Sequence, residues 1–351
     1  MRHNQLLNLT YPIIQAPMAG NILTPELVAA VSNAGMLGSI ASGYLSLTAL
    51  EEFILKVKQL TMKPFVVNVF IEPEQKTPQI LLKPQLIMDL ERQLGMPDAP
   101  DFTLPATIPQ DEYINLLLKH NVPVVSCTFG LFSPDNLLRL KKHAVVVIAN
   151  ATNLAEVHAA YQSGVDAIVL QGFAAGGHQA SFINNGQCNQ LSSLELLKQV
   201  QSLNLAIPLI VTGGINCANF TQFLAAGANY VQLGTSFMLS NLSNLDLTHQ
   251  QYLIRQSSNS TALSQNLTGK WARGINNQLM QQLDQCAYPF PIQHYASAKL
   301  RGFARNHGLF DYTGSWLGQH ASYAIQSTND LLQHLINCYI SYSNVVKPGD
   351  S

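Results

Sequence analysis

Residues 164–180 read GVDAIVLQGFAAGGHQA. The apolar run from Ala167 to Leu170 predicts a short buried strand, and the glycine-rich segment after it carries one histidine, His178. Glycine lets the backbone bend sharply and approach a ligand closely, and histidine has the unperturbed pKa nearest neutrality. Because α/β folds place their chemistry in loops at the carboxyl ends of strands, this stretch predicts a parallel sheet and an active-site loop.

The same unit, a short apolar run followed by a helix-forming segment, recurs along most of the chain. Continuous apolar runs are typical of strands buried on both faces of a parallel sheet. They lie near residues 11–15, 37–41, 65–70, 122–130, 144–150, 167–170, 207–215 and 228–237. Capping residues for the helices are expected at Thr24, Ser46 or Thr48, Ser133, Thr152, Ser192 or Ser193, and Asn216. Eight such strands predict a closed TIM (β/α)8 barrel. An open doubly wound sheet is the alternative, disfavoured because no GxGxxG follows the first strand.

The alternation lapses in two places. Residues 71–109 are rich in proline and are expected to be helical only near 84–95, whereas residues 240–290 are rich in Gln, Asn and Ser and are expected to be helical. A long connection of the first kind is often a lid or binding segment, with a passive surface elaboration as an equal alternative. We predict a small, mostly helical lobe made of 71–109 and 240–317. The barrel is then assigned 1–70, 110–239 and 318–345, its last outer helix covering about 318–340.

Composition excludes several classes of partner. Charged residues make up 11% of the 351 residues and the net charge is −1, so no field attracts nucleic acid or a membrane surface. No apolar run approaches the ~18 residues that span a bilayer, and no signal peptide is evident, which predicts a cytoplasmic protein. The five cysteines form no CxxC pair, so we expect reduced thiols and no metal site. The low charge is compatible with a homodimer, although no segment marks its interface.

Two late motifs point to a phosphate. VTGGI places Gly213 and Gly214 after the seventh strand, and QLGTSF places Gly234 and Thr235 after the eighth. Loops at these positions of a barrel commonly bind phosphate through backbone N–H groups. No P-loop lysine accompanies them, which favours a flavin mononucleotide or a sugar phosphate over a nucleoside triphosphate. The alternative is that these glycines only form tight turns.

One loop and two side-chain amides are also expected to face the cavity. The first loop, QAPMAG, offers backbone amides and the thioether of Met18, while Asn68 and Gln171 end the third and sixth strands. An uncharged side-chain amide offers donors and acceptors together, which suits the pyrimidine edge of a flavin. The alternative is that both amides only satisfy backbone groups at the strand ends.

Taken in order, QAPMAG, FVVNVF, DAIVLQGFAAGGHQA, IPLIVTGGI and ANYVQLGTSFM resemble the nitronate monooxygenase family, formerly called 2-nitropropane dioxygenases. The similarity spans about residues 8–240 and continues weakly through GKWARG, YPFPIQ and GSWLGQ. It implies an FMN-bearing TIM barrel that oxidises alkyl nitronates, such as propionate 3-nitronate, with O₂ and without NAD(P)H. A role in detoxification is implied as well.

The resemblance also implies roles for individual residues. His178 corresponds to the proposed base, although Phe173-Ala174-Ala175 lacks the acidic residue that often precedes the family's GGH. Tyr295, Lys299 and Trp316 are expected on the substrate side. The residues expected to bind FMN are Ala16, Pro17, Met18, Asn68, Gln171, Gly176, Gly177, Gly213, Gly214, Gly234, Thr235 and Gln319.

Two other functions stay open from the sequence. Related flavin barrels are NAD(P)H-dependent FMN reductases that act on a quinone or an enoyl-thioester, and the loop motifs do not exclude that chemistry. A barrel that binds a phosphate ligand without redox chemistry is the third alternative. Reduction of the bound flavin by NAD(P)H, or a colourless protein that takes up no FMN, would distinguish these two.

Overall fold

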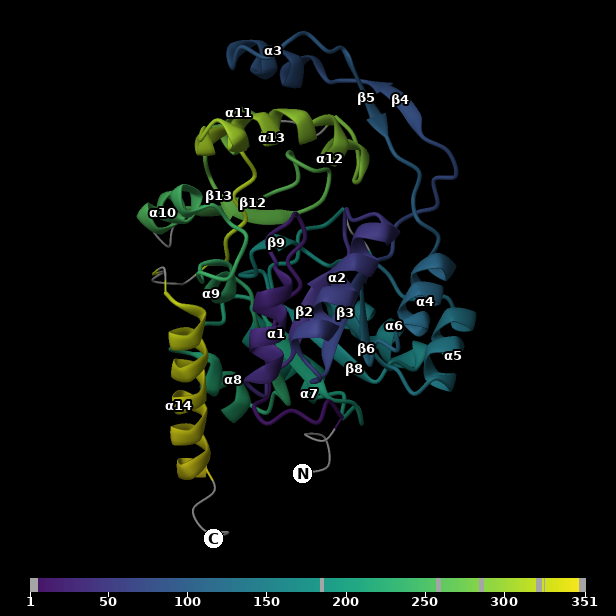
Figure 1. Ribbon diagram of the computed structural model, residues 1–351, viewed down its shortest axis with the longest axis vertical. Helices are drawn as coiled ribbons and strands as arrows, with labels where there is room; N and C mark the ends of the chain where they lie inside the picture. The colour runs from purple at the N-terminus through teal and green to yellow at the C-terminus, as the bar shows by residue number, and fades with distance from the viewer. Residues whose placement is uncertain are drawn as a thin grey trace.

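The centre of the molecule is a sheet of eight parallel strands surrounded by helices (Figure 1). The computed structural model describes residues 6–183, 186–256, 260–283, 287–319, 324 and 326–346. The strands are β1 (Ile13–Gln15), β2 (Gly38–Ala41), β3 (Phe65–Phe70), β6 (Val124–Thr128), β7 (Val146–Ala151), β8 (Ala167–Gln171), β10 (Leu209–Thr212) and β11 (Tyr230–Leu233). They pair in the order β1-β11-β10-β8-β7-β6-β3-β2, and a parallel bridge from Ile14 to Leu37 brings β1 to β2. The barrel is therefore nearly closed, which confirms the predicted TIM-barrel fold.

The barrel interior changes character along its axis. Toward the amino ends of the strands it is apolar, with Val66, Val124 and Tyr230 in one buried cluster. Toward the carboxyl ends, buried polar side chains replace the apolar ones: Gln15, Asn68, Ser126, Asn150, Thr212 and Gln232. Because successive residues of a strand face opposite sides, the outer face of the same strands stays apolar and packs on the helices. The polar end is where a ligand can be bound.

The outer helices follow the expected alternation. They are α1 (Pro25–Asn33), α2 (Leu47–Leu60), α4 (Gln110–Lys119), α5 (Pro134–Lys142), α6 (Leu154–Ser163), α7 (Ser193–Gln201), α8 (Phe220–Ala225) and α14 (Thr328–Val346). The expected caps Thr24, Ser46, Ser133 and Ser192 each accept a backbone hydrogen bond at their helix start. The last outer helix begins at Thr328, later than the expected 318, and residues 320–323 and 325 lie outside the described part of the chain.

Two expected caps are wrong by one and three residues. α6 is capped by Asn153, because the Thr152 amide and hydroxyl both donate to the Glu156 carboxylate. The Asn216 side chain accepts a hydrogen bond from the Ala218 N–H in a local turn. The N-cap residue of α8 is Asn219 instead. In both places a short polar side chain bonds its own neighbourhood before the helix starts.

A lobe covers the carboxyl ends of the strands. One of its segments is the hairpin β4 (Gln79–Leu82) and β5 (Asp101–Leu104), with α3 (Gln85–Gln93) between the two strands. The other follows β11 and contains α9 (Thr235–Met238), α10 (Leu247–Arg255), β12 (Thr261–Ser264), β13 (Ala272–Ile275), α11 (Gln278–Gln282), α12 (Ile292–Ala296), α13 (Ala298–Asn306) and the 3₁₀ turn η2 (Phe310–Tyr312). Figure 1 shows α11, α12 and α13 above the barrel, with α3 arching beyond them.

The lobe is less helical than expected, since residues 261–264 and 272–275 form strands. β13 pairs with β12 on one side and with β9 (Gly177–His178) on the other, all antiparallel. Because β9 belongs to the loop that carries His178, this sheet depends on a tertiary contact that local sequence does not encode.

The two segments of the lobe share one apolar core. Ile87 and Phe102 from the hairpin segment pack with Leu279 and Leu300 from the second segment. Burying one such side chain stabilises the folded protein by roughly 1.5–3 kcal/mol relative to leaving it exposed. This shared core therefore holds the hairpin against α11–α13.

The sequence predicts no membrane-spanning helix, no metal site and no disulfide framework, and the described residues can be compared with each of these expectations. Within them, no helix combines the length and apolarity needed to cross a membrane, and no group of His, Cys, Asp and Glu is arranged to hold a metal ion. Cys127, Cys188, Cys217 and Cys338 are free thiols. The fifth cysteine, Cys286, lies outside the described part.

Candidate active site

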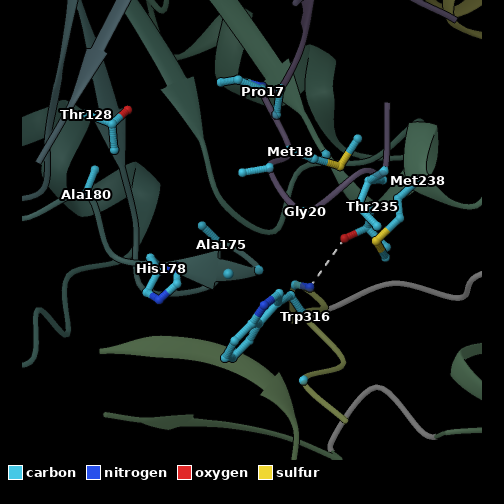
Figure 2. A pocket seen from close by; sticks show the side chains of 18 of the residues that line it. Pro17, Met18, Gly20, Thr128, Ala175, His178, Ala180, Thr235, Met238 and Trp316 are labelled. Atoms are coloured by element: carbon cyan, nitrogen blue, oxygen red, sulfur yellow. Dashed lines mark hydrogen bonds between the residues drawn. The ribbon is translucent and has the colours of Figure 1, made fainter. Parts of the chain in front are cut away.

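The carboxyl ends of the barrel strands open into a cavity of about 420 Å³, a volume typical of small-molecule sites. Most residues expected to act in the site line it, and Figure 2 shows several of them. These are Ala16, Pro17, Met18, Asn68, Gln171, Gly176, Gly177, His178, Gly213, Gly214, Gly234, Thr235, Trp316 and Gln319. Tyr295 and Lys299 do not line it; Lys299 is exposed, and Tyr295 packs edge-on against His294 with ring centroids 5.3 Å apart.

The loop that carries His178 is held as a strand. His178 pairs with Ala272, and Gly177 pairs with Arg273. From below, the Gln171 amide donates to the His178 carbonyl at 3.1 Å and accepts from the Ala180 N–H at 2.7 Å. The side chain expected to contact a ligand therefore also fixes the histidine loop, and its amide is committed to backbone groups on both sides.

The His178 imidazole sits in an apolar and cationic environment. Its ring lies 5.9 Å from the Phe129 ring, 5.5 Å from Phe290 and 5.5 Å from Trp316, and Figure 2 shows it facing the same space as Trp316. Burial, with smaller contributions from the positive charges of Lys270 and Arg301, lowers the pKa of His178 to about 3. The ring is therefore neutral at every pH near physiological.

The orienting partner of this imidazole is a hydroxyl. His178 Nε2 lies 2.9 Å from Thr268 Oγ1, and that hydroxyl is 3.2 Å from the Lys270 carbonyl, to which it donates. In this arrangement Nε2 carries the proton and Nδ1 keeps its lone pair, an assignment made from the hydrogen-bond pattern. Sequence reasoning noted that no acidic residue precedes GGH, but it did not identify Thr268, which lies immediately before the quoted GKWARG motif.

Glycines and backbone amides form the opposite wall. Gly213 and Gly214 have φ angles of +111° and +70°, a backbone conformation that favours glycine. Thr235 Oγ1 accepts from the Gly318 N–H at 3.3 Å (Figure 2), which ties the start of α9 to the segment after Trp316. The turns after β10 and β11 are therefore joined to a third segment of chain.

An unused acceptor marks this wall. The backbone N–H of Gln319 donates to the Ala174 carbonyl at 2.9 Å. Its side-chain Oε1 is buried and has no hydrogen-bond partner among the described residues. Because buried polar atoms are nearly always paired, this oxygen fits a ligand that donates a hydrogen bond, as the N–H edge of an isoalloxazine does.

The barrel strands contribute an uncharged polar floor. Asn68 Nδ2 donates to Ser126 Oγ at 2.8 Å and to Thr128 Oγ1 at 3.0 Å. Asn150 Nδ2 donates to the Cys127 carbonyl at 2.8 Å and to Thr128 Oγ1 at 3.1 Å. These amides are held in place by neighbouring strands, so the floor is rigid and neutral.

Two arginines that sequence reasoning missed line the cavity. Arg301 and Arg305 lie one turn apart on α13, and Arg301 is only 7% exposed. No Asp or Glu is among the lining residues that the structure describes. The sequence predicts Lys299 as the cation on the substrate side, but Lys299 is exposed and does not line the cavity. The cavity thus favours anions.

A buried carboxylate fixes the chain that follows His178. Glu156 on α6 is fully buried, and its Oε1 accepts from the Ser181 hydroxyl and from the Phe182 and Ile183 amides at 2.8–3.0 Å. Ser181 in turn accepts a hydrogen bond from Lys270 Nζ at 2.6 Å through its carbonyl. The Lys270 ammonium lies 4.8 Å from the Phe129 ring centroid. The wall around the imidazole therefore depends on an acid in the outer helix layer.

Replacing Glu156 with glutamine is expected to lower the free energy of unfolding by roughly 2–3 kcal/mol, because the amide N–H₂ faces buried donors that lose their acceptor. Urea denaturation measures this change in the free energy of unfolding. The control is Glu52→Gln at an exposed position of α2, which is expected to change the free energy of unfolding by less than about 0.5 kcal/mol. Equal effects of the two substitutions would contradict the assigned role.

Three histidines, one buried and two half-buried, are expected to make the fold sensitive to acid. Burial is the main cause that lowers the pKa of His178 to about 3, that of His249 to about 4, and that of His294 well below its usual range. Unfolding restores ordinary values near 6.5. Below that pH the unfolded chain binds protons that the folded chain does not, so stability falls as the pH drops from about 6.5 toward 4.

The expected slope is up to about 1.4 kcal/mol per pH unit for each histidine. Urea denaturation at pH 7, 5.5 and 4.5 measures it. His249→Gln keeps a donor for Ser315 Oγ, which lies 3.0 Å from His249 Nε2, and should reduce the slope by one histidine's share. The exposed control His143→Gln should leave the slope unchanged; matching slopes for both variants would refute the explanation.

Comparison with known proteins gives consistent similarities. The family model described as nitronate monooxygenase matches residues 3–337. A probable nitronate monooxygenase of Staphylococcus aureus (strain MSSA476) is 35% identical over 344 residues, which is 96% of each chain. The crystal structure of nitroalkane oxidase from Streptomyces ansochromogenes matches with a TM-score of 0.84 and 29% identity, over 97% of this chain and 99% of that one. FabK from Thermotoga maritima matches with a TM-score of 0.75 and 23% identity, over 98% of this chain and 97% of that one, a likeness of fold alone.

Proposed function

We propose, from the premise that the chain belongs to the nitronate monooxygenase family, that it is an FMN-dependent enzyme that oxidises alkyl nitronates with O₂. The chain is an oxidoreductase; the cofactor, the substrate class and the oxidant are the proposed parts. One observation carries them: the cavity joins a glycine-rich wall, a neutral imidazole and two arginines, with no described carboxylate in its lining.

The glycine-rich wall fits FMN. We assign the phosphate to the turns of Gly213, Gly214 and Gly234, with the Thr235 hydroxyl beside them. The unpaired Oε1 of Gln319 suits a flavin N–H, and Met18 on the first loop lines the same cavity and would contact the flavin. A flavin mononucleotide bound there would supply the redox chemistry, the transfer of electrons from the nitronate to O₂.

His178 is proposed to adapt to the substrate through Thr268. A hydroxyl both donates and accepts, so unlike a carboxylate it does not fix the imidazole tautomer. With Nε2–H donating to Thr268, Nδ1 has a lone pair that can take the α-proton of a neutral nitroalkane. With Thr268 donating to Nε2, Nδ1–H can bond a nitronate oxygen. Because burial lowers the pKa of His178 to about 3, the imidazole is a weak base, and its contribution to proton abstraction is expected at the lower end of the roughly 10²–10⁴ range of general-base catalysis.

The visible spectrum of the pure protein and an anaerobic reductant titration test this proposal. A yellow protein whose flavin is bleached by propionate 3-nitronate alone supports it. Bleaching by NADH or NADPH, with no response to the nitronate, would point instead to an NAD(P)H-dependent reductase. A colourless protein that does not take up added FMN would exclude both.

A further inference from the structure

Both arginines of α13, Arg301 and Arg305, lie on the face of the helix that lines the cavity. Ala298, Arg301, Gly302 and Arg305 all line the cavity. The spacing explains this, since residues four apart lie about 40° apart around a helix. Small residues at 298 and 302 leave room for the two guanidinium groups. Arg301 is 7% exposed, whereas Arg305 is exposed and lies at the mouth.

The Arg301 guanidinium is held only by neutral groups. Its Nε donates to Ser297 Oγ at 3.0 Å, and its Nη2 donates to the His294 carbonyl at 2.8 Å and to His294 Nδ1 at 3.3 Å. Nη1 donates to none of the residues that the structure describes. No described carboxylate lies within ion-pair distance of Arg301; the described ion pairs all involve other cations.

A buried cation without a counter-ion is unfavourable unless a ligand supplies the negative charge. Burial lowers the pKa of Arg301 only to about 10, so it stays charged at neutral pH. Two of its three nitrogens are already fixed in direction by Ser297 and His294. The remaining Nη1 is therefore an oriented donor, of the kind that binds a carboxylate oxygen.

The position of Arg301 places it on the substrate side. A Cβ at Gly314 would lie 3.3 Å from the Trp316 ring and 3.6 Å from Arg301 Cδ, so the arginine stem and the indole flank the same glycine. His294, to which Arg301 donates hydrogen bonds, stacks on Tyr44 with ring centroids 4.3 Å apart. The turns assigned to the FMN phosphate come from the barrel, whereas Arg301 comes from the lobe above it (Figure 1).

We propose that Arg301, with Arg305 at the mouth, binds a second anionic group of the substrate, a carboxylate remote from the nitronate, and so selects carboxylate-bearing nitronates. This inference rests on the proposed function for the nitronate end alone. Propionate 3-nitronate carries both charges, and propyl-1-nitronate replaces the carboxylate with a methyl group. The two compounds form a matched pair.

Steady-state kinetics on this pair test the selection. Arg301→Gln is expected to lower kcat/KM for propionate 3-nitronate about 100-fold and that for propyl-1-nitronate less than about threefold. Arg301→Lys should recover part of the loss, because it keeps the charge without the planar fork. The exposed Lys142→Gln on α5 changes the net charge equally and should affect neither substrate. Equal losses for both nitronates in Arg301→Gln would overturn the proposal.

Binding without turnover separates this inference from the proposed function. Calorimetric titration of the wild-type protein should detect succinate and not succinamide, its uncharged analogue, and Arg301→Gln should weaken succinate binding by a similar factor of about 100. The dissociation constant for FMN should stay within about twofold. Unchanged succinate affinity, or a large loss of FMN affinity, would refute a substrate role for Arg301. Succinate binding by a protein that oxidises neither nitronate would sink the proposed function and leave the anion site standing.

Discussion

His178→Asn is expected to lower kcat/KM for nitroethane by about 10² and for its nitronate by only about tenfold. General-base catalysis contributes roughly 10²–10⁴, and that contribution is needed only where a C–H bond must be broken. The nitronate has already lost its proton, so it loses a single hydrogen bond, worth about 1.4 kcal/mol or less. Measuring both substrates with the same enzyme preparation gives the ratio directly.

The pH profile is an independent readout of this imidazole. With the pKa of His178 lowered to about 3 by burial and by the charges of Lys270 and Arg301, the base is already unprotonated at pH 5. The wild-type kcat/KM for nitroethane should therefore not fall between pH 8 and pH 5 through protonation of His178, although an ordinary histidine would titrate there. A clear inflection near 6.5 that disappears in His178→Asn would show that the ring is more solvated than its packing indicates.

Thr268→Val is the matched second variant, because it removes the hydroxyl and keeps the shape. If the hydroxyl lets the tautomer follow the substrate, its loss should affect both nitroethane and the nitronate by about tenfold. Losses in His178→Asn that are the same for both substrates would contradict the base assignment, whatever Thr268→Val does.

The barrel could be predicted because its signals are local. Each strand is a short run buried on both faces, and helices such as α1 and α7 begin at residues that cap them in the structure, Thr24 and Ser192. Neither signal depends on residues far away in the chain. The cavity residues followed from the same pattern, since residues at the carboxyl ends of strands must meet at one end of a barrel.

The lobe and its cations could not be predicted in the same way. β9 is two residues long, and its partner β13 lies at Ala272–Ile275, so nothing near His178 marks it as a strand. On α13, rotation of the helix decides which cation enters the cavity. Leu300 and Ala304 are buried in the lobe, and Arg301 lies about 200° from Lys299 around the helix. Only the packing of the lobe shows that Arg301 is inside.

Glu156 illustrates a third kind of limit. In the sequence it is an acid in the first turn of a helix, where such residues commonly lie exposed and interact with the helix dipole. In the structure it is fully buried and accepts hydrogen bonds from Ser181, Phe182 and Ile183. These hydrogen bonds depend on the return of residues 181–183, which follow β8 and β9, to the start of α6. No local sequence pattern specifies this contact.

The second large effect is expected at Gly213, where Gly213→Ala should weaken FMN binding by about 100-fold or more. Its φ of +111° is a conformation that alanine rarely adopts. An added Cβ would also lie 2.9 Å from the Gly172 carbonyl oxygen, 3.0 Å from Ser193 Oγ and 3.1 Å from the Ala175 amide nitrogen. Ser193 Oγ donates to the Thr212 and Gly213 carbonyls at 2.8 Å, so the turn cannot shift without breaking these bonds.

Gly164→Ala separates the loss of FMN from backbone strain in general. Gly164 has a φ of +87° as the C-cap of α6, and an added Cβ there would meet no atom within 4 Å. It should cost about 1–2 kcal/mol of stability through strain and leave the FMN dissociation constant unchanged, as measured by quenching of flavin fluorescence. Equal FMN affinities in the two variants would mean that the β10 turn does not hold the phosphate. A loss confined to Gly213→Ala would support the assignment of this turn to the cofactor, because strain is common to both variants and the crowding of the cavity wall is not.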